Sequence, residues 1–206
     1  EMGQSLSGSD TTALVAKSIL DREPGSTIIH NLICSRAVPE TIKRYGGQAL
    51  RSRVGHSYIK QLMAETDAAF AGEHSGHYYF RDNYRADSGL IAALLVMQEI
   101  SDKGISLSSL RKDFGSYSST GEINFRVDNP TDVIERISDT FSDHEHDYLD
   151  GLTVNGDKWW FNLRPSNTEP LLRLNLEADN GITMEREFMK VRACLEQFVE
   201  SEGKVD

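Results

Sequence analysis

One apolar run near the start of the chain limits the fold more than any other segment. Residues 26–33 read STIIHNLI, which is rich in β-branched side chains and almost without polar alternation. Such a run is typical of a strand covered on both faces by helices. A helical pattern that Asp10 can cap ends before Pro24-Gly25, and a second, shorter one begins at Pro39. The segment therefore predicts a layered α/β unit.

The alternation of strand and helix patterns continues to Gly104. Residues 48–54 are expected to form a strand, 56–66 a helix and 68–72 a short buried strand, and a last helix follows that Asp87 or Ser88 can cap. Strands joined through helices pair in parallel. We therefore expect a three-layer α/β domain with a mainly parallel sheet.

The second half of the chain has a different pattern. Serine and glycine are frequent between residues 106 and 120, and we place a domain boundary there, giving domains 1–115 and 116–206. Strands are expected over 122–128, 148–154, 158–163 and 171–178, and helices from Asn129-Pro130 and over 183–200. Asn155-Gly156 suits a two-residue hairpin turn. This order predicts an α+β domain with an antiparallel sheet and two helices.

Composition and charge exclude some classes of partner. The net charge is -10, whereas nucleic-acid binding requires a basic surface. No apolar run approaches the ~20 residues of a membrane-spanning helix, and the first residues lack the pattern of a signal peptide. We therefore expect a cytoplasmic protein that binds neither nucleic acid nor membrane. Cys34 and Cys194 are expected to be reduced thiols rather than a disulfide.

The segment GEHSGH, residues 72–77, is the first loop that could carry chemistry, because it follows a strand of the parallel sheet at the end where ligands bind. Glu73 and Ser75 could hydrogen-bond to hydroxyl groups, and His77 could exchange a proton near neutral pH. The competing interpretation is an ordinary turn with surface histidines. A zinc site at His74 and His77 is disfavoured, since no further ligand cluster is near them in sequence.

The segment RPSNTEP, residues 164–170, is the second such loop and lies between two alternating apolar runs. Arg164 offers a planar fork of donors for a phosphate, and Ser166, Asn167 and Thr168 add hydroxyl and amide groups. A hydrophilic hairpin is the alternative. Residues 116–206 carry the whole net charge of -10. Because exposed charges are screened over about 8 Å, an anion would be held here by direct donors, above all by Arg164.

Two further segments are interpreted structurally. The run DHEHD, residues 143–147, is expected to be a solvated charged loop rather than a metal site. Trp159-Trp160, on a predicted strand, should place one ring in the core and the other toward solvent or a neighbouring domain.

The two loops occur together with other short segments in a recognisable order. These segments are Ser35-Arg36 with Val38-Pro39, VGHS at 54–57, Ile59-Lys60, HYYFRD at 77–82 and RADSG at 85–89. Over nearly the whole chain the sequence resembles the α-D-phosphohexomutases, most closely the phosphomannomutase/phosphoglucomutase branch. Members have four domains, and the chain resembles the third and fourth.

The resemblance implies roles for individual residues. Glu73 and Ser75 would contact the sugar hydroxyls, with His56 lining the same cleft and His77 as general acid/base. The phosphate that is not reacting would be held by a loop made of Arg164, Ser166, Asn167 and Thr168. A basic substrate contact that follows the first strand in the family is Ile33 here, with Arg36 three positions later, so that contact is not assigned.

The resemblance also implies an activity and its cofactors. Family members interconvert hexose 6-phosphates and hexose 1-phosphates with Mg2+, through glucose or mannose 1,6-bisphosphate. The family's phosphoserine loop and its Asp-rich metal loop are not found in the sequence. We therefore expect the partners to be hexose phosphates and N-terminal domains 1 and 2, and no mutase turnover by this chain alone.

Alternatives remain open at this point. The same loops could belong to a stand-alone sugar-phosphate binding or regulatory module. A phosphoglucosamine mutase is disfavoured, since that branch usually has Gly where this chain has Asn167. The preference between mannose and glucose stays undecided, because both sugars present the same O3 and O4 to Glu73 and Ser75.

Overall fold

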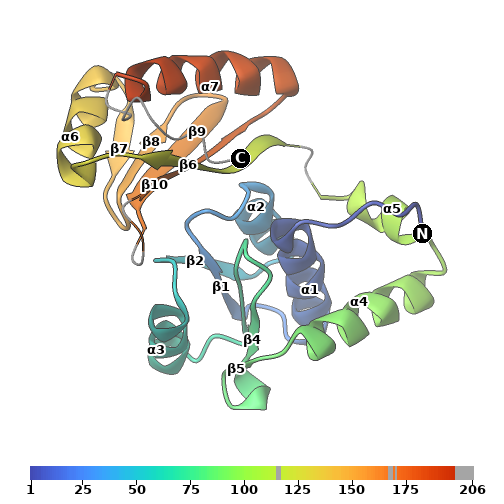
Figure 1. The fold of residues 1–206 in the computed structure, drawn as a ribbon. Helices are drawn as coiled ribbons and strands as arrows, with labels where there is room; N and C mark the ends of the chain where they lie inside the picture. The colour runs from blue at the N-terminus through green and yellow to red at the C-terminus, as the bar shows by residue number, and fades with distance from the viewer. Residues whose placement is uncertain (115–116, 167–168, 170, 198–206) are drawn as a thin grey trace. The chain divides into compact units, whose positions relative to one another are not determined.

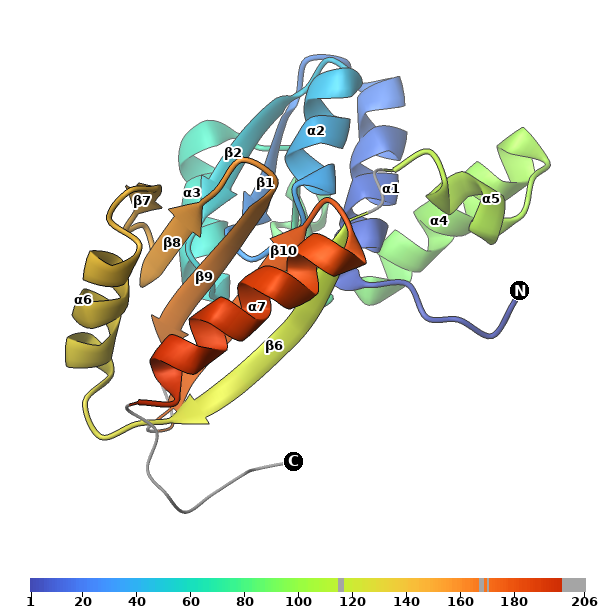
Figure 2. The same ribbon diagram turned by 90° about the horizontal axis from the view of Figure 1, so that it is seen from above.

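The computed structural model describes residues 1–114, 117–166, 169 and 171–197. Two compact units, Glu1–Ser116 and Tyr117–Asp206, make up the chain (Figures 1 and 2). Each unit has a five-stranded sheet and its own apolar core. None of the helices in the described part of the chain is long and apolar enough to cross a membrane.

The sheet of the first unit is mainly parallel, as predicted. Its strand order is β2-β1-β3-β4-β5, in which β1 (Thr27–Asn31) pairs in parallel with β2 (Gln48–Ser52) and β3 (Phe70–Gly72). The strands β4 (Tyr78–Phe80) and β5 (Ala86–Asp87) extend the sheet in antiparallel pairing. These two strands were not predicted, because three and two residues are too few to show an alternating pattern.

Helices cover both faces of this sheet (Figure 1). The helices are α1 (Gly8–Arg22), α2 (Ala37–Arg44), α3 (His56–Thr66), α4 (Gly89–Lys103) and α5 (Leu107–Arg111), with a 3-10 turn at Arg81–Asn83. Ile28 packs in a cluster with residues of α1, α2 and α4, whereas its neighbour Ile29 packs with Ile59 and Met63 of α3. Successive strand residues point to opposite faces, so the apolar run 26–33 is explained by cover on both sides.

The predicted cap of one helix needs correction, and that of another is decided between two candidates. Helix α1 begins after Ser7, whose hydroxyl accepts from Asp10 N at 3.0 Å while Asp10 Oδ2 accepts from Ser7 N at 3.2 Å. Asp10 is therefore the third residue of a capping box and not the cap itself. Of the two candidates for α4, Ser88 is the cap, since its hydroxyl accepts from Ile91 N at 3.2 Å.

The second unit is the predicted α+β domain with an antiparallel sheet of order β6-β10-β9-β8-β7. The strands are β6 (Ser118–Arg126), β7 (Glu145–Asp147), β8 (Leu152–Asn155), β9 (Trp159–Pro165) and β10 (Leu171–Ala178). Helices α6 (Pro130–Thr140) and α7 (Gly181–Leu195) contribute to one apolar core with alternate residues of the strands (Figure 2). Asn129 caps α6, as predicted. A register shift at Asn175/Glu177 marks a bulge in the pairing of β6 with β10.

The hairpin between β8 and β9 turns two residues later than predicted. Asn155 pairs with Trp160, and Gly156 N donates to Trp159 O at 2.9 Å, so Asp157-Lys158 lies at the centre of the turn. A Cβ on Gly156 would lie 2.3 Å from the ring of Trp159. The glycine therefore makes room for an indole ring and does not supply the turn.

Both tryptophans are buried. Trp159 belongs to the core, as predicted. Trp160 does not face solvent, because it is 5% exposed and its Nε1 donates to Glu177 Oε1 at 3.0 Å.

The charged run 143–147 is not the solvated loop that we expected. Glu145–Asp147 forms β7, an edge strand. His146 is tied to α6, since its Nε2 donates to Phe141 O at 2.9 Å, and the ring of His144 packs edge-on against Trp159. Among the described residues no group of three or more His, Cys, Asp or Glu side chains could hold a metal ion.

Candidate functional site

The loop that joins β3 to β4 lies where the parallel strands β1 and β3 end, since His30 is level with Gly72. Glu73 N donates to His77 O at 2.9 Å, and Gly76 N donates to Glu73 O at 3.0 Å. Gly76 has a φ of +87°, which favours glycine. The loop is thus a tight hairpin turn, and it holds Glu73 and His77 at its two ends.

The first turn of α1 packs directly against this loop. A Cβ on Gly8 would lie 2.2 Å from His74 O, and a Cβ on Gly72 would lie 2.3 Å from Thr12 Oγ1. The Ser9 hydroxyl also lies 3.0 Å from His74 Nδ1. These contacts fix the loop from a second side, and they engage His74 in packing rather than in a metal site.

Glu73 is the most enclosed of the predicted site residues that the structure describes. The residue is only 2% exposed, and both of its carboxylate oxygens are hydrogen-bonded. Oε1 accepts from the Tyr79 hydroxyl at 2.7 Å, and Oε2 accepts from Asn31 Nδ2 at 3.2 Å. Each carboxylate oxygen can accept a second hydrogen bond. Glu73 is therefore a preorientated acceptor with capacity left for a ligand hydroxyl.

Tyr79 links Glu73 to His56. Its hydroxyl oxygen is also within hydrogen-bonding distance of His56 Nδ1. Since the single hydroxyl proton goes to Glu73, His56 Nδ1 must carry a proton and donate it to the Tyr79 oxygen. Burial, and then the adjacent Glu73 carboxylate, raise the pKa of Tyr79, so the hydroxyl stays protonated at neutral pH.

His77 is held by Asp87, which is the second residue of β5. The distance between His77 Nδ1 and Asp87 Oδ2 is 2.7 Å, and Asp87 Oδ1 accepts from Tyr78 N at 2.8 Å. Burial opposes ionisation of Asp87, but the hydrogen bonds from His77 and Tyr78 outweigh it and lower the pKa of the carboxyl. The charged Asp87 therefore favours the His77 tautomer that is protonated on Nδ1.

The structure brings three of the predicted residues into one cluster. The rings of His56 and His77 meet edge to face with centroids 4.5 Å apart, and Tyr79 joins His56 to Glu73. Ser75 is exposed at the tip of the same loop. Sequence reasoning missed Asn31, Tyr79 and Asp87. Tyr79 and Asp87 lie in the segments HYYFRD and RADSG, but neither was given a site role, and Asp87 was considered only as a possible helix cap.

The second predicted site lies at the ends of β9 and β10. Arg164 is 6% exposed, and its Nη2 donates to Glu122 Oε2 of β6 at 3.1 Å. Burial lowers the pKa of Arg164, against the influence of the Glu122 carboxylate. Ser166 Oγ accepts from Arg173 Nη2 at 3.3 Å. Asn167 and Thr168 lie outside the described residues.

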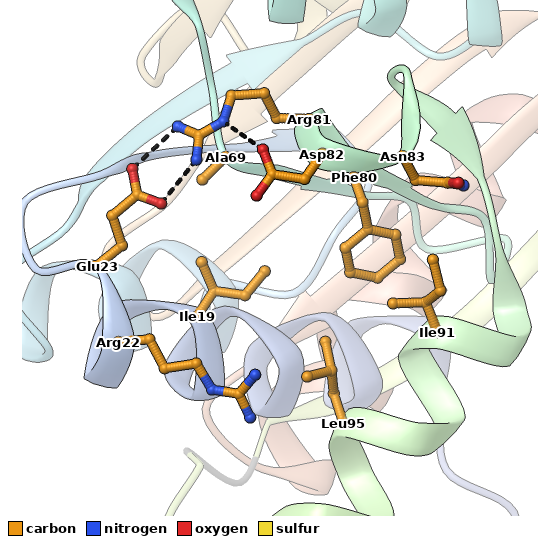
Figure 3. Close-up of a pocket in the computed structure, with 10 residues that line it drawn as sticks. All are labelled: Ile19, Arg22, Glu23, Ala69, Phe80, Arg81, Asp82, Asn83, Ile91 and Leu95. Atoms are coloured by element: carbon orange, nitrogen blue, oxygen red, sulfur yellow. Dashed lines mark hydrogen bonds and ion pairs between the residues drawn. The ribbon is translucent and has the colours of Figure 1, made fainter.

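One cavity of the first unit lies elsewhere. It has a volume of about 470 Å3 and is lined by Ile19, Arg22, Glu23, Ala69, Phe80, Arg81, Asp82, Asn83, Ile91 and Leu95 (Figure 3). Phe80 is level with Phe70, whereas the loop 72–77 starts from the opposite end of this hairpin. Arg81 pairs with both carboxylate oxygens of Glu23, at 2.9 and 2.8 Å. Arg81 and Glu23 therefore satisfy each other, and this cavity contains none of the predicted site residues.

Models of known protein families match both units of the chain. The family model for the phosphoglucomutase/phosphomannomutase alpha/beta/alpha domain III matches residues 7–117, and that for the C-terminal domain matches residues 122–193. The chain belongs to the phosphoglucomutase/phosphomannomutase family.

Individual relatives agree with this assignment. A phosphomannomutase of Methanocaldococcus jannaschii is 46% identical over 192 residues, which are 93% of this chain and 43% of the relative. A phosphomannomutase of Escherichia coli K12 is 36% identical and covers 89% of the chain and 41% of the relative. The chain thus spans less than half the length of these curated relatives.

Solved structures show the same fold. A phosphoglucomutase/phosphomannomutase family protein of Burkholderia thailandensis superposes with a TM-score of 0.82 at 30% identity, covering 95% of this chain and 42% of that one. An Aspergillus fumigatus N-acetylphosphoglucosamine mutase in complex with glucose 1,6-bisphosphate has a TM-score of 0.71 at 13% identity, over 94% of this chain and 44% of that one. The second likeness concerns the fold alone.

Proposed function

We propose that the chain is the C-terminal part of a phosphohexomutase of the phosphomannomutase/phosphoglucomutase type, which interconverts hexose 6-phosphates and hexose 1-phosphates through a hexose 1,6-bisphosphate. The observation that carries the proposal is the cluster of Glu73, His56 and His77, in which a buried carboxylate and two histidines meet where the parallel strands end. Family membership and the phosphomannomutase relatives support it.

In this proposal Glu73 and Ser75 recognise two neighbouring sugar hydroxyls. The Glu73 carboxylate is held by Tyr79 and Asn31 before ligand arrives. A preorganised acceptor loses little conformational entropy on binding. The sugar must bind in two orientations, since each of its two phosphate positions has to reach the reacting centre in turn. A site that recognises hydroxyls shared by several hexoses suits this requirement.

His77 moves the proton of the reacting hydroxyl. With Nδ1–H directed to Asp87, Nε2 is the nitrogen that can accept the proton as the hydroxyl oxygen attacks phosphorus and the bond from phosphorus to its former oxygen breaks. In the reverse transfer Nε2 returns the proton. His56 lies beside His77 and adds a second imidazole to the cluster.

Arg164 and Ser166 hold the phosphate that does not react. A guanidinium fork matches two phosphate oxygens, and the hydroxyl of Ser166 can donate to a third. The residues described here do not fit the family's magnesium site, because no group of three potential ligands exists among them. Mg2+ and the phosphate-donating group would therefore come from N-terminal domains 1 and 2, and we expect no turnover by this chain alone.

Titration of mannose 1-phosphate into the 15N-labelled chain tests the proposal. Amide signals of Arg164, Ser166 and Glu73 should move, and Arg164→Ala should weaken binding at least about tenfold, because a charge-assisted hydrogen bond to phosphate is lost. Glu73→Gln should weaken it while leaving the phosphate response at Ser166. The control ligand is mannose, which lacks the phosphate. Unmoved signals at millimolar ligand, or mutase turnover by the chain alone, would contradict the proposal.

A further inference from the structure

The strand β1 ends in a turn that brings a buried cysteine back to a buried asparagine. Asn31 is the last residue of β1, and Cys34 N donates to Asn31 O at 3.1 Å, which closes a four-residue turn. Asparagine suits the first position of such a turn. Both residues are buried. The turn therefore places the Cys34 side chain beside the amide of Asn31, away from solvent.

The Cys34 thiol donates to that amide. Its Sγ lies 3.1 Å from Asn31 Oδ1 and 3.8 Å from a second acceptor, Gly72 O. Burial raises the pKa of the Cys34 thiol to about 12, so the thiol keeps its proton at neutral pH and acts as a donor rather than as a nucleophile. The nearer acceptor, Asn31 Oδ1, therefore receives the thiol proton.

The partners of the Asn31 amide determine which of its two ends faces Glu73. The oxygen and nitrogen ends have nearly the same shape, so the hydrogen-bond partners decide between two orientations. A backbone N–H can only donate, and His74 N donates to Asn31 Oδ1 at 3.4 Å. With the thiol as a second donor, both lone pairs of Oδ1 are used. Nδ2 is thereby directed to Glu73 Oε2, to which it donates at 3.2 Å.

The thiol contributes to this orientation because the bond from His74 N to Oδ1 is longer than is usual for an N–H donor. In the reversed orientation Oδ1 would face the Glu73 carboxylate, and two acceptors would repel each other. Nδ2 would at the same time face the donors of His74 and Cys34. The Cys34 thiol therefore favours the orientation of Asn31 in which the Glu73 carboxylate is held.

We propose that Cys34 is a positioning residue for the sugar-recognition carboxylate and acts on Glu73 through Asn31. This inference rests on the proposed function, in which Glu73 accepts from a sugar hydroxyl. Oε2 of Glu73 is fixed by the bonds that run from Cys34 through Asn31, whereas Oε1 is fixed separately by the Tyr79 hydroxyl. All of these donors are uncharged. They hold the carboxylate without neutralising it, so it stays a strong acceptor for a hydroxyl.

Removal of the thiol tests the inference. Cys34→Ala and Cys34→Val both lack the donor, but the first leaves space and the second fills it, so a loss that they share comes from the donor and not from packing. Each should weaken binding of mannose 1-phosphate about threefold and leave binding of inorganic phosphate, which has no sugar hydroxyl, unchanged. Asn31→Ala removes the direct bond to Glu73 and should weaken binding of mannose 1-phosphate about tenfold. Calorimetric titration of the chain measures these affinities.

Rescue by serine separates the orientation of the amide from general support of the fold. Cys34→Ser restores a donor at the same position and should bind mannose 1-phosphate like wild type. Hydrogen exchange of the Asn31 side-chain amide should be faster in Cys34→Ala and Cys34→Val, because an amide that can turn releases its bond to Glu73, and slow again in Cys34→Ser. Cys194→Ala removes the thiol of α7 in the second unit and should change neither affinity.

The outcomes distinguish this inference from the function on which it rests. If Glu73→Gln loses the preference for mannose 1-phosphate over inorganic phosphate while Cys34→Ala and Cys34→Val keep it, the role of Cys34 is wrong and the proposed function stands. A wild-type chain that binds the two ligands equally would contradict both. Binding by Cys34→Ser that is as weak as that of Cys34→Ala would overturn the inference alone.

Discussion

Proton positions in the candidate site follow from counting donors and acceptors around two residues. Tyr79 has one proton and two partners, so the direction of its bond to Glu73 decides that His56 carries a proton on Nδ1. Asp87 accepts from His77 Nδ1 and so places the proton of the His77 ring on that nitrogen. Both histidines therefore present Nε2 as the nitrogen that remains for chemistry. Tyr79 and Asp87, to which the sequence analysis gave no site role, thus determine the proton positions of the two histidines.

The tautomer of His77 should depend on Asp87. In Asp87→Ala the acceptor for Nδ1–H is lost, and the neutral ring should shift toward the form protonated on Nε2. Asp87→Asn keeps an acceptor oxygen and should retain the Nδ1–H form. In a protein that includes the N-terminal domains, Asp87→Ala should lower turnover by at least about tenfold, since a general acid/base typically contributes more than that.

Long-range 15N correlation spectra of the histidine rings measure this tautomer. Asp82→Asn is the matched control, because Asp82 is an exposed carboxylate that bonds to Arg81. An Nδ1–H signal that persists unchanged in Asp87→Ala would contradict the assigned role of Asp87.

At the scale of single elements, β1 connects the buried core with the site at its end. Asn31 reaches Glu73, and the preceding residue, His30, is 5% exposed, with Nδ1 donating to Asn31 O at 3.1 Å. Burial lowers the pKa of His30 to about 4, against the small raising effect of this hydrogen bond. A neutral histidine inside the central strand makes the stability of the unit depend on pH.

Stability should fall as the solution is acidified. The unfolded chain binds a proton at His30 near pH 6.5, whereas the folded chain does so only near pH 4. The contribution of His30 is therefore complete above pH 6.5 and is lost as the pH falls toward 4, where the loss reaches about 3 kcal/mol. Urea unfolding at pH 7 and at pH 4.5 measures this loss of stability.

His30→Gln supplies the comparison for that measurement, because it removes the titrating group from the same position. Its stability should change less between the two pH values than that of wild type. Equal losses in the two proteins would show that His30 does not account for the dependence.

Several elements could be predicted from sequence because their signals are local. The apolar run of β1, the Asn129-Pro130 start of α6 and the loop RPSNTEP between two strands each lie within a few neighbouring residues. The motif GEHSGH was likewise found at the end of a buried strand, where the sequence predicted it; that it forms a site stays a prediction. A short sequence pattern is enough to predict an element when the residues that define the element are close together in the sequence.

Other features could not be predicted because their partners are distant in sequence. Glu122 and Arg164 are brought together by β10 lying between their strands, and Tyr79 of β4 contacts His56 at the start of α3. The order and register of the strands determine both contacts, and a short sequence segment does not reveal that order or register. The short strands β4 and β5, which carry Tyr79 and Asp87, were missed for the same reason: their pairing and not their pattern defines them.

At the scale of the whole molecule, the two units have separate cores. The described clusters around β1 contain residues of the first unit only, and the cluster around β9 and β10 contains residues of the second only. The family models divide the chain at nearly the same place. A domain of this size with its own core can fold alone.

Residues 117–206 expressed alone should therefore fold and respond to phosphate. Glu122, Arg164, Ser166 and Arg173 all lie within this unit, so mannose 1-phosphate should still move their amide signals. The matched piece, residues 1–116, should show no phosphate response. Loss of folding in the isolated second unit, or a response confined to the first, would contradict this division.

The two edge strands of the second sheet also affect whether molecules of the protein associate in crowded solution. The strand β7 is three residues long, and Glu145 and Asp147 place negative charges on it, while the other edge, β6, is bent by the bulge opposite Asn175 and Glu177. Short, charged or bulged edges resist the addition of a strand from another molecule. We therefore expect the charges of the run DHEHD to disfavour pairing of this edge with a strand of another molecule.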